Sequence, residues 1–73
     1  MMHAAKIQKS DRLQRVYRLL RYIKKEGNPW LSTRAIIMNA NVCAVNSIVA
    51  ELRANGKDIQ CKRTGNVWRY RLA

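Results

Sequence analysis

The chain of 73 residues is poor in the side chains that carry out catalysis and bind metals. It has a single histidine, His3, two cysteines and four acidic residues. Cys43 and Cys61 lack the Cys-x-x-Cys spacing, and a zinc site needs about four ligands. No nucleophile, base and orienting group occur at a plausible spacing. We therefore expect no metal, no cofactor and no enzymatic activity.

Long apolar runs are also missing. No stretch approaches the roughly 18 apolar residues of a membrane span, and the N-terminal Met-Met-His-Ala-Ala-Lys lacks the apolar run of a signal peptide. We expect a cytoplasmic protein without a membrane partner. Hydrophobic residues make up 48% of the chain, which is too many for a disordered basic tail. The length fits one small domain.

Positive charge is what the sequence has in excess. Fifteen lysines and arginines against four acidic residues give a net charge of +11 and a pI of about 10.7. Such an excess favours a polyanionic partner, most often nucleic acid, with a membrane surface or an acidic protein as alternatives. The basic residues gather in residues 1–30 and 57–73 and flank a nearly neutral middle. This distribution suggests a nucleoid-associated protein.

The first helix is predicted from Ser10, a good N-cap, to the residues before Gly27 and Pro29. Residues 1–9 then form a basic tail, and residues 10–73 form the domain. An apolar stripe at helical spacing runs along this helix. The opposite side is either a solvated face or one that faces phosphates, and it carries Arg15, Arg18, Arg21 and Lys25.

Two shorter helices are predicted in the middle of the chain. Ser32 is a second N-cap and opens a helix over residues 33–38. Asn39 tolerates positive φ and is expected to take the left-handed turn position. Asn41 is expected to cap a third helix over about residues 42–55. Trp30-Leu31 is too short for more than a bridge or a one-pair strand.

After Gly56 the period changes to the alternation of strands. Two alternating runs, joined by Thr64-Gly65-Asn66, predict a two-stranded hairpin with one apolar and one basic face. Because a lone hairpin is marginal in water, its apolar face should pack on the helices. The residues that we expect in the core on this pattern are Cys61, Trp68 and Tyr70, together with Tyr17 and Trp30.

The order helix, short strand, helix, tight turn, helix, hairpin predicts an α+β fold. It is the order of a winged helix-turn-helix, with three helices and a C-terminal two-stranded β-hairpin as the wing. Ala35 would let two helices approach closely. The apolar contacts that would fix the angle between the helices of the turn are Met38, Ala40, Val45 and Ile48.

Residues 41–59, with Tyr70-Arg71-Leu72 at the end, resemble the N-terminal winged-helix domains of bacterial regulators of the biotin ligase/repressor type. In that group a helix ending Leu-Arg-x-x-Gly, here residues 52–56, precedes a strand, a Gly-containing wing and a final Gly-Tyr-x-Leu. The resemblance implies sequence-specific binding of double-stranded DNA by the third helix. Asn39 replaces the usual turn glycine, and the wing over residues 64–69 is longer than in the family. With no second domain expected, and hence no ligase activity, the chain looks like a small regulator of the kind common in phages.

Ten residues are candidates for DNA contacts in such a domain. At the start of the third helix, Asn46 suits bidentate pairing with adenine, Ser47 suits several bases, and Val42 or Cys43 suits a thymine methyl group. The remaining residue of this helical set is Asn41. Phosphate contacts are expected from the second helix and the wing, with Arg63 and Asn66 as candidates for the minor groove. The residues of this phosphate-binding set are Arg34, Lys62, Arg63, Asn66 and Arg69.

Other functions stay open. Asn46 is alternatively a solvated polar residue, and Lys62 and Arg63 alternatively keep an edge hairpin soluble. A third helix without a basic residue before Arg53 also suits a protein-docking module. A third possibility is a non-specific or architectural binder of DNA or RNA. A homodimer is a further candidate partner, because one module buries only about 600 to 1,000 Å² on DNA.

Overall fold

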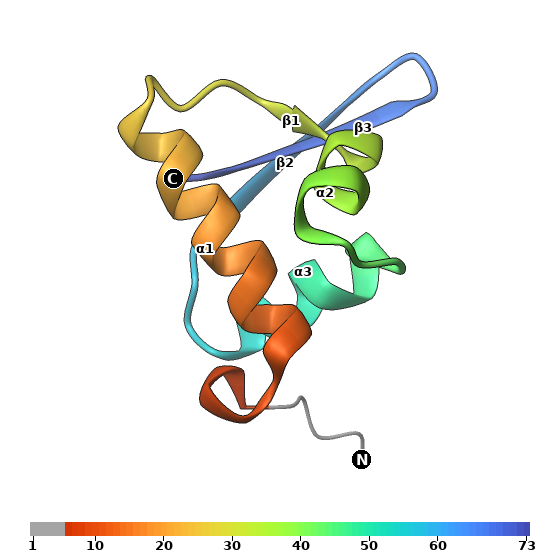
Figure 1. Cartoon of the computed structure of the whole chain (residues 1–73). Coiled ribbons are helices and arrows are strands. Elements are labelled where there is room, and N and C mark those ends of the chain that lie inside the picture. Colours follow the sequence, from red (N-terminus) through yellow and green to blue (C-terminus); the bar gives the residue numbers. More distant parts are fainter. Residues whose placement is uncertain (1–5) are drawn as a thin grey trace.

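A computed structural model of the chain describes residues 6–73 (Figure 1). The predictions for residues 1–5, which include His3 and the start of the basic tail, lie outside the described residues. The elements in chain order are η1 (Ile7–Lys9), α1 (Asp11–Lys25), β1 (Leu31–Ser32), α2 (Thr33–Ala40), α3 (Val45–Ala54), β2 (Ile59–Thr64) and β3 (Val67–Leu72). The predicted α+β class with three α-helices is confirmed.

Helix α1 begins and ends where its sequence predicts. Ser10 Oγ accepts a hydrogen bond from the Leu13 amide at 3.5 Å, and Gly27 follows the helix with a φ of 101°. Part of the predicted tail belongs to the folded domain, because Ile7 in η1 packs against the core. The Ile7 amide also donates to Asn55 Oδ1 at 3.0 Å, which ties η1 to the end of α3.

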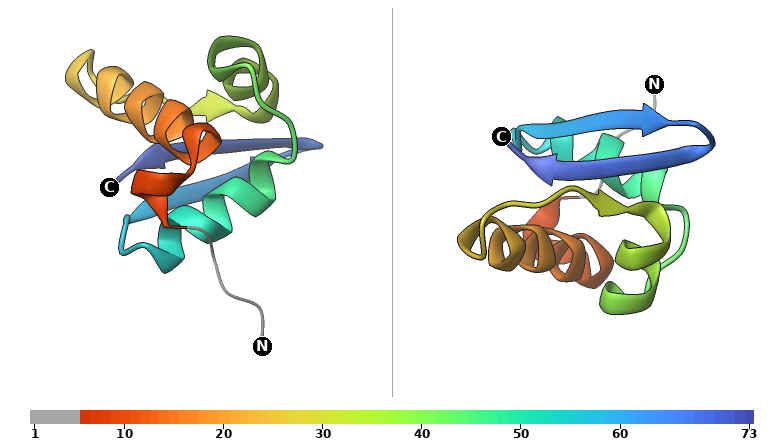
Figure 2. Two further views of the ribbon diagram at one scale, coloured as in Figure 1. Left: turned by 60° about the horizontal axis from the view of Figure 1, so that its bottom comes forward. Right: turned by 90° about the horizontal axis from the view of Figure 1, so that it is seen from above.

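The sheet has three antiparallel strands in the order β1-β3-β2, one more than the predicted hairpin. A bridge or one-pair strand was expected at Trp30-Leu31. The observed strand β1 lies one residue later and forms two pairs, Leu31 with Tyr70 and Ser32 with Arg69 of β3. Strands β2 and β3 are joined by the two-residue turn Gly65-Asn66, so most of the predicted long wing is strand. The turn end of this hairpin extends beyond the helices (Figures 1 and 2).

The core lies where the three helices meet the sheet. All three helices contribute fully buried side chains, as their apolar periodicity predicts. Helix α3 turns inward the residues Val45, Ile48, Val49 and Leu52. The sheet adds Ile59, Tyr70 and Leu72, and Tyr70 is 6% exposed, as the alternation predicts.

Three core predictions and one predicted contact between helices are wrong. Trp68 is 45% exposed, and Cys61 is also exposed. Both point to the same side of the hairpin as Tyr70, but this face is buried only near the Ile59–Leu72 end. Trp30 is half-buried and contacts cations on the other face. Met38 is 69% exposed, because α2 turns Ile36 and Ala40 toward the core instead.

The turn between α2 and α3 lies two residues later than predicted. Asn39 remains helical, and its Nδ2 donates to the Ala35 carbonyl at 2.8 Å. The left-handed residue is Asn41, with a φ of 53°, and a second, Ala44, has the same φ. Helix α2 runs on because Ala40 is buried in the core. Consequently α3 begins at Val45, and residues 41–43 lie in the turn.

Arg15 holds this turn from α1. Its Nε donates to the Ala40 carbonyl at 2.9 Å, its Nη2 donates to the Asn41 carbonyl at 3.2 Å, and it forms an ion pair with Asp11. The last carbonyls of α2 are thereby satisfied by a cation, which the negative end of a helix favours. The guanidinium therefore has a structural partner and is not simply part of a solvated face.

Candidate nucleic-acid interface

The exposed face of α3 is small and uncharged over its first turns. Asn46, Ser47 and Ala50 are exposed between the buried positions. No hydrogen bond within residues 6–73 engages the Asn46 or Ser47 side chain. Arg53, the first basic residue of α3, donates to the Ile59 carbonyl from Nε at 3.1 Å and from Nη2 at 2.7 Å. One amide side chain, Asn46, and one hydroxyl side chain, Ser47, are thus available to an external partner.

The N-terminus of α3 is open. Serine side chains cap α1 and α2, but no side chain caps α3, whose N-cap residue is Ala44. Amides at the start of a helix together with its dipole favour an anion. The exposed Asn46 and Ser47 lie within this first turn. A helix start of this kind combines polar side chains with a weak preference for negative charge.

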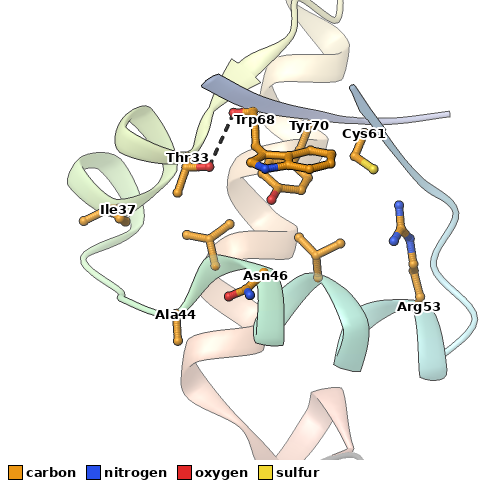
Figure 3. Close-up of a pocket in the computed structure, with 10 residues that line it drawn as sticks. Thr33, Ile37, Ala44, Asn46, Arg53, Cys61, Trp68 and Tyr70 are labelled. Carbon is orange, nitrogen blue, oxygen red and sulfur yellow. Dashed lines mark hydrogen bonds between the residues drawn. The ribbon is translucent and has the colours of Figure 1, made fainter. Parts of the chain in front are cut away.

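A hollow of about 510 Å³, which no pattern in the sequence predicted, lies between α2, α3 and the hairpin. Figure 3 shows the Trp68 indole and the Tyr70 ring above α3, with Asn46 on the helix below. Thr33 closes the α2 side and donates from Oγ1 to the Trp68 carbonyl at 3.4 Å. The hollow is mostly apolar, and Asn46 lies on its border.

The register of β2 and β3 divides the hairpin residues between two faces. Arg63 pairs with Trp68, and Lys62 pairs with Arg69. Because neighbouring residues of a strand point to opposite faces, Arg63 and Trp68 share the face of the buried Tyr70. Lys62 and Arg69 are on the opposite face, which we call the outer sheet face. The predicted phosphate contacts of the hairpin therefore do not form one surface.

Arg63 and Asn66 are at or near the turn of the hairpin. The Arg63 guanidinium lies 5.9 Å from the centre of the Trp68 ring, and its Nε donates to the Gly65 carbonyl at 2.8 Å. These contacts orient the guanidinium at the exposed end of the hairpin. Asn66 is exposed in the turn itself. The turn end of the hairpin, between β2 and β3, extends beyond the helices (Figure 2).

The remaining candidates occupy separate places. Arg34 is exposed in the first turn of α2, and Asn41 and Cys43 are exposed in the turn before α3. Val42, a candidate for contact with a thymine methyl group, is half-buried and packs against the core, so only part of its side chain is available to a base. Its burial follows from the late start of α3, because Val42 lies in the α2–α3 turn and not on the outer side of a helix.

Comparisons with protein-family models, with curated proteins and with solved structures find no match to this chain. Within residues 6–73, no three side chains of His, Cys, Asp or Glu form a group that could hold a metal ion. In the same part of the chain, no single helix has the length and apolarity to cross a membrane. Helices α2 and α3 have this length and apolarity only when they are taken together, and they are bent by 84° relative to each other.

Proposed function

We propose that this protein binds double-stranded DNA with a sequence preference and acts as a transcriptional regulator. The observation that carries the proposal is the exposed, uncharged polar face of α3 at an uncapped helix start, with Arg63 at the nearby hairpin. The element order and the sheet are consistent with a winged helix-turn-helix, in which α2 and α3 form the motif and β2 and β3 form the wing. A helix of this width fits the major groove.

Asn46 and Ser47 are the proposed base-reading residues. An asparagine amide pairs bidentately with N6 and N7 of adenine, and a hydroxyl donates to or accepts from several bases. Since neither side chain has a partner within the described residues, neither must break a protein contact to bind. An arginine can pair bidentately with guanine, but the Arg53 guanidinium already donates to the Ile59 carbonyl. We therefore expect a preference for A·T-containing sites.

Phosphate contacts are proposed for Arg34 on α2 and for Arg63 and Asn66 on the wing. Arg34 and Arg63 are exposed and form no ion pair with an acidic residue within residues 6–73. Contacts of this kind fix the position of a protein on DNA and give binding its salt dependence. Each phosphate neutralised by an arginine adds about 0.9 to the salt slope, so Arg34 and Arg63 alone lower the affinity about tenfold between 50 and 200 mM salt.

Selection from a random duplex pool, followed by fluorescence anisotropy, tests the proposal. We expect a defined motif to be enriched. Asn46→Ala should bind the selected and the random duplex almost equally, while binding to the random duplex persists. Arg63→Ala should weaken both and lower the salt slope by about one. Gln8→Ala, which removes an exposed amide from η1, is the matched control and should retain the preference.

Two results would contradict this assignment. A pool that gains no motif would remove the reading role of α3. A preference that survives Asn46→Ala would move the reading to other residues. The melting temperature of each variant is measured alongside, because a change in binding can be assigned to the lost side chain only if the variant is folded.

Protein docking is the second candidate function, and the hollow beside α3 favours it. Trp68 at 45% exposure, together with the exposed Ile37, offers an apolar surface to a partner side chain. A docking module predicts weak, salt-sensitive DNA binding without sequence preference. Under that function, Asn46→Ala and Gln8→Ala would bind every duplex alike.

A further inference from the structure

The outer sheet face carries a cluster of cations around one aromatic ring. The cluster consists of Trp30, Lys62, Arg69 and Arg71. The Lys62 ammonium lies 4.6 Å, and the Arg71 guanidinium carbon 4.3 Å, from the centre of the Trp30 ring. Arg71 Nε also donates to Gln60 Oε1 at 2.9 Å. Two strands and the residue before β1 thus bring three positive charges to one side of the sheet.

In the part of the chain that the structure describes, these charges have no acidic partner. The ion pairs within residues 6–73 join Arg12 to Glu51 and Arg15 to Asp11, and both are formed by residues of the helices. Lys62 lies directly opposite Arg69 in the strand register, and like charges in that position destabilise a sheet. The Trp30 ring attracts Lys62 and Arg71 but makes no such contact with Arg69. A face that keeps unpaired like charges together is suited to an anion.

The indole contacts indicate which kind of anion fits. Proteins that bind single strands present free aromatic faces on which bases stack. The Trp30 ring is already in contact with two cations, so it is not a free stacking platform. The N–H groups of Lys62, Arg69 and Arg71 are the donors that phosphate oxygens accept. The chemistry therefore fits a duplex phosphate backbone better than unstacked bases.

This face points away from the proposed DNA interface. Arg63 and Trp68 are on the opposite face of the same hairpin, beside the hollow at α3. We propose that the outer sheet face binds the phosphate backbone of a second DNA segment, so that one protein molecule bridges two duplexes. Only the binding of the first duplex rests on the proposed function, and sequence reading by α3 is not needed.

A bridging assay tests this inference. One random-sequence duplex is fixed to beads, the protein is added, and capture of a second, fluorescent duplex is measured. The variant K62E/R71E should lower capture by about tenfold. The control R18E/K25E makes the same change in net charge on exposed positions of α1 and should retain capture. Anisotropy on a single duplex should give similar affinities for the two variants.

A milder variant protects the test against unfolding. Arg69 has neither a ring contact nor a hydrogen bond through its side chain within residues 6–73, so Arg69→Gln is expected to fold. It should lower capture by a few-fold through the loss of one phosphate contact. Thermal melting of all variants accompanies the assay. If K62E/R71E is unfolded, Arg69→Gln decides, and unchanged capture by that variant would overturn the inference.

The remaining outcomes separate this inference from the proposed function. Wild-type protein that binds one duplex but captures no second one refutes bridging alone. Bridging that survives in K62E/R71E points to two copies acting through their α3 helices and also refutes it. Equal loss in R18E/K25E assigns the effect to net charge or to α1 and also refutes bridging by the outer sheet face. Capture that depends on the outer face, without any enriched motif, supports bridging while the proposed sequence preference fails.

Discussion

Replacing Ala44 with glycine should stabilise the protein. Ala44 precedes α3 with a φ of 53° and a ψ of 51°, a left-handed conformation that costs an L-residue about 1–2 kcal/mol. Glycine avoids this cost but gains freedom in the unfolded chain, worth about 0.4–1 kcal/mol. We expect Ala44→Gly to raise the free energy of unfolding by about 0.5–1 kcal/mol.

Ala50 is the matched control for Ala44. It is an exposed residue in the interior of α3, where glycine costs about 1 kcal/mol relative to alanine. The same substitution, alanine to glycine, should therefore raise the free energy of unfolding at residue 44 and lower it at residue 50. The gap of about 1.5–2 kcal/mol corresponds to roughly 10 °C in melting temperature for a domain of this size. Urea unfolding followed by circular dichroism measures both variants.

The opposite result would refute the observed start of α3. If the helix began at residue 42, as the sequence suggests, Ala44 would lie in its first turn. Ala44→Gly would then destabilise the protein, as Ala50→Gly does. A shared loss would therefore restore the earlier helix start and return residues 42 and 43 to a helical surface.

Two further predictions concern the turn and the hairpin. Arg15→Ala should lower the free energy of unfolding by about 1–2 kcal/mol, because it removes two charged hydrogen bonds to carbonyls at the end of α2; Arg18→Ala, at an exposed position of the same helix, should stay within about 0.5 kcal/mol. Equal losses in urea unfolding would contradict this role of Arg15. Tyr70→Ala should cost about 3–5 kcal/mol, as truncation of a buried aromatic does, and Trp68→Ala clearly less, because Trp68 is 45% exposed. A larger loss at Trp68 would show that the end of the hairpin is more buried than the structure indicates.

Local signals in the sequence predicted most of the fold. Ser10 and Ser32 cap helices as expected, and the apolar spacing of α3 identified its buried side. These features depend on neighbours within one turn, so they are visible in sequence. The position of the α2–α3 turn depends on tertiary packing, because burial of Ala40 keeps α2 helical past Asn39. The local pattern of a single sequence carries no information about that tertiary contact.

The candidate site was harder to predict than the fold. Alternation along the hairpin gave the correct faces, but not how far the helices cover them. Trp68 and Tyr70 share one phase of the strand, yet only Tyr70 is buried. The short strand itself was expected, but its partner was out of reach, because pairing of Leu31 with Tyr70 joins residues far apart in sequence. That pairing places Trp30 beside the cations of the outer sheet face.

Much of the basic charge near α3 has internal partners. Arg12 pairs with Glu51 of α3 at 2.6 Å, Arg15 holds the α2–α3 turn, and Arg53 binds the Ile59 carbonyl. These three guanidinium groups are thus engaged in contacts within the protein, and the exposed residues in the first turns of α3, Asn46, Ser47 and Ala50, carry no charge. If α3 reads DNA, its contacts discriminate between bases, whereas the salt dependence arises from Arg34 and the hairpin. Substitutions on α3 should then change the sequence preference without changing the salt slope.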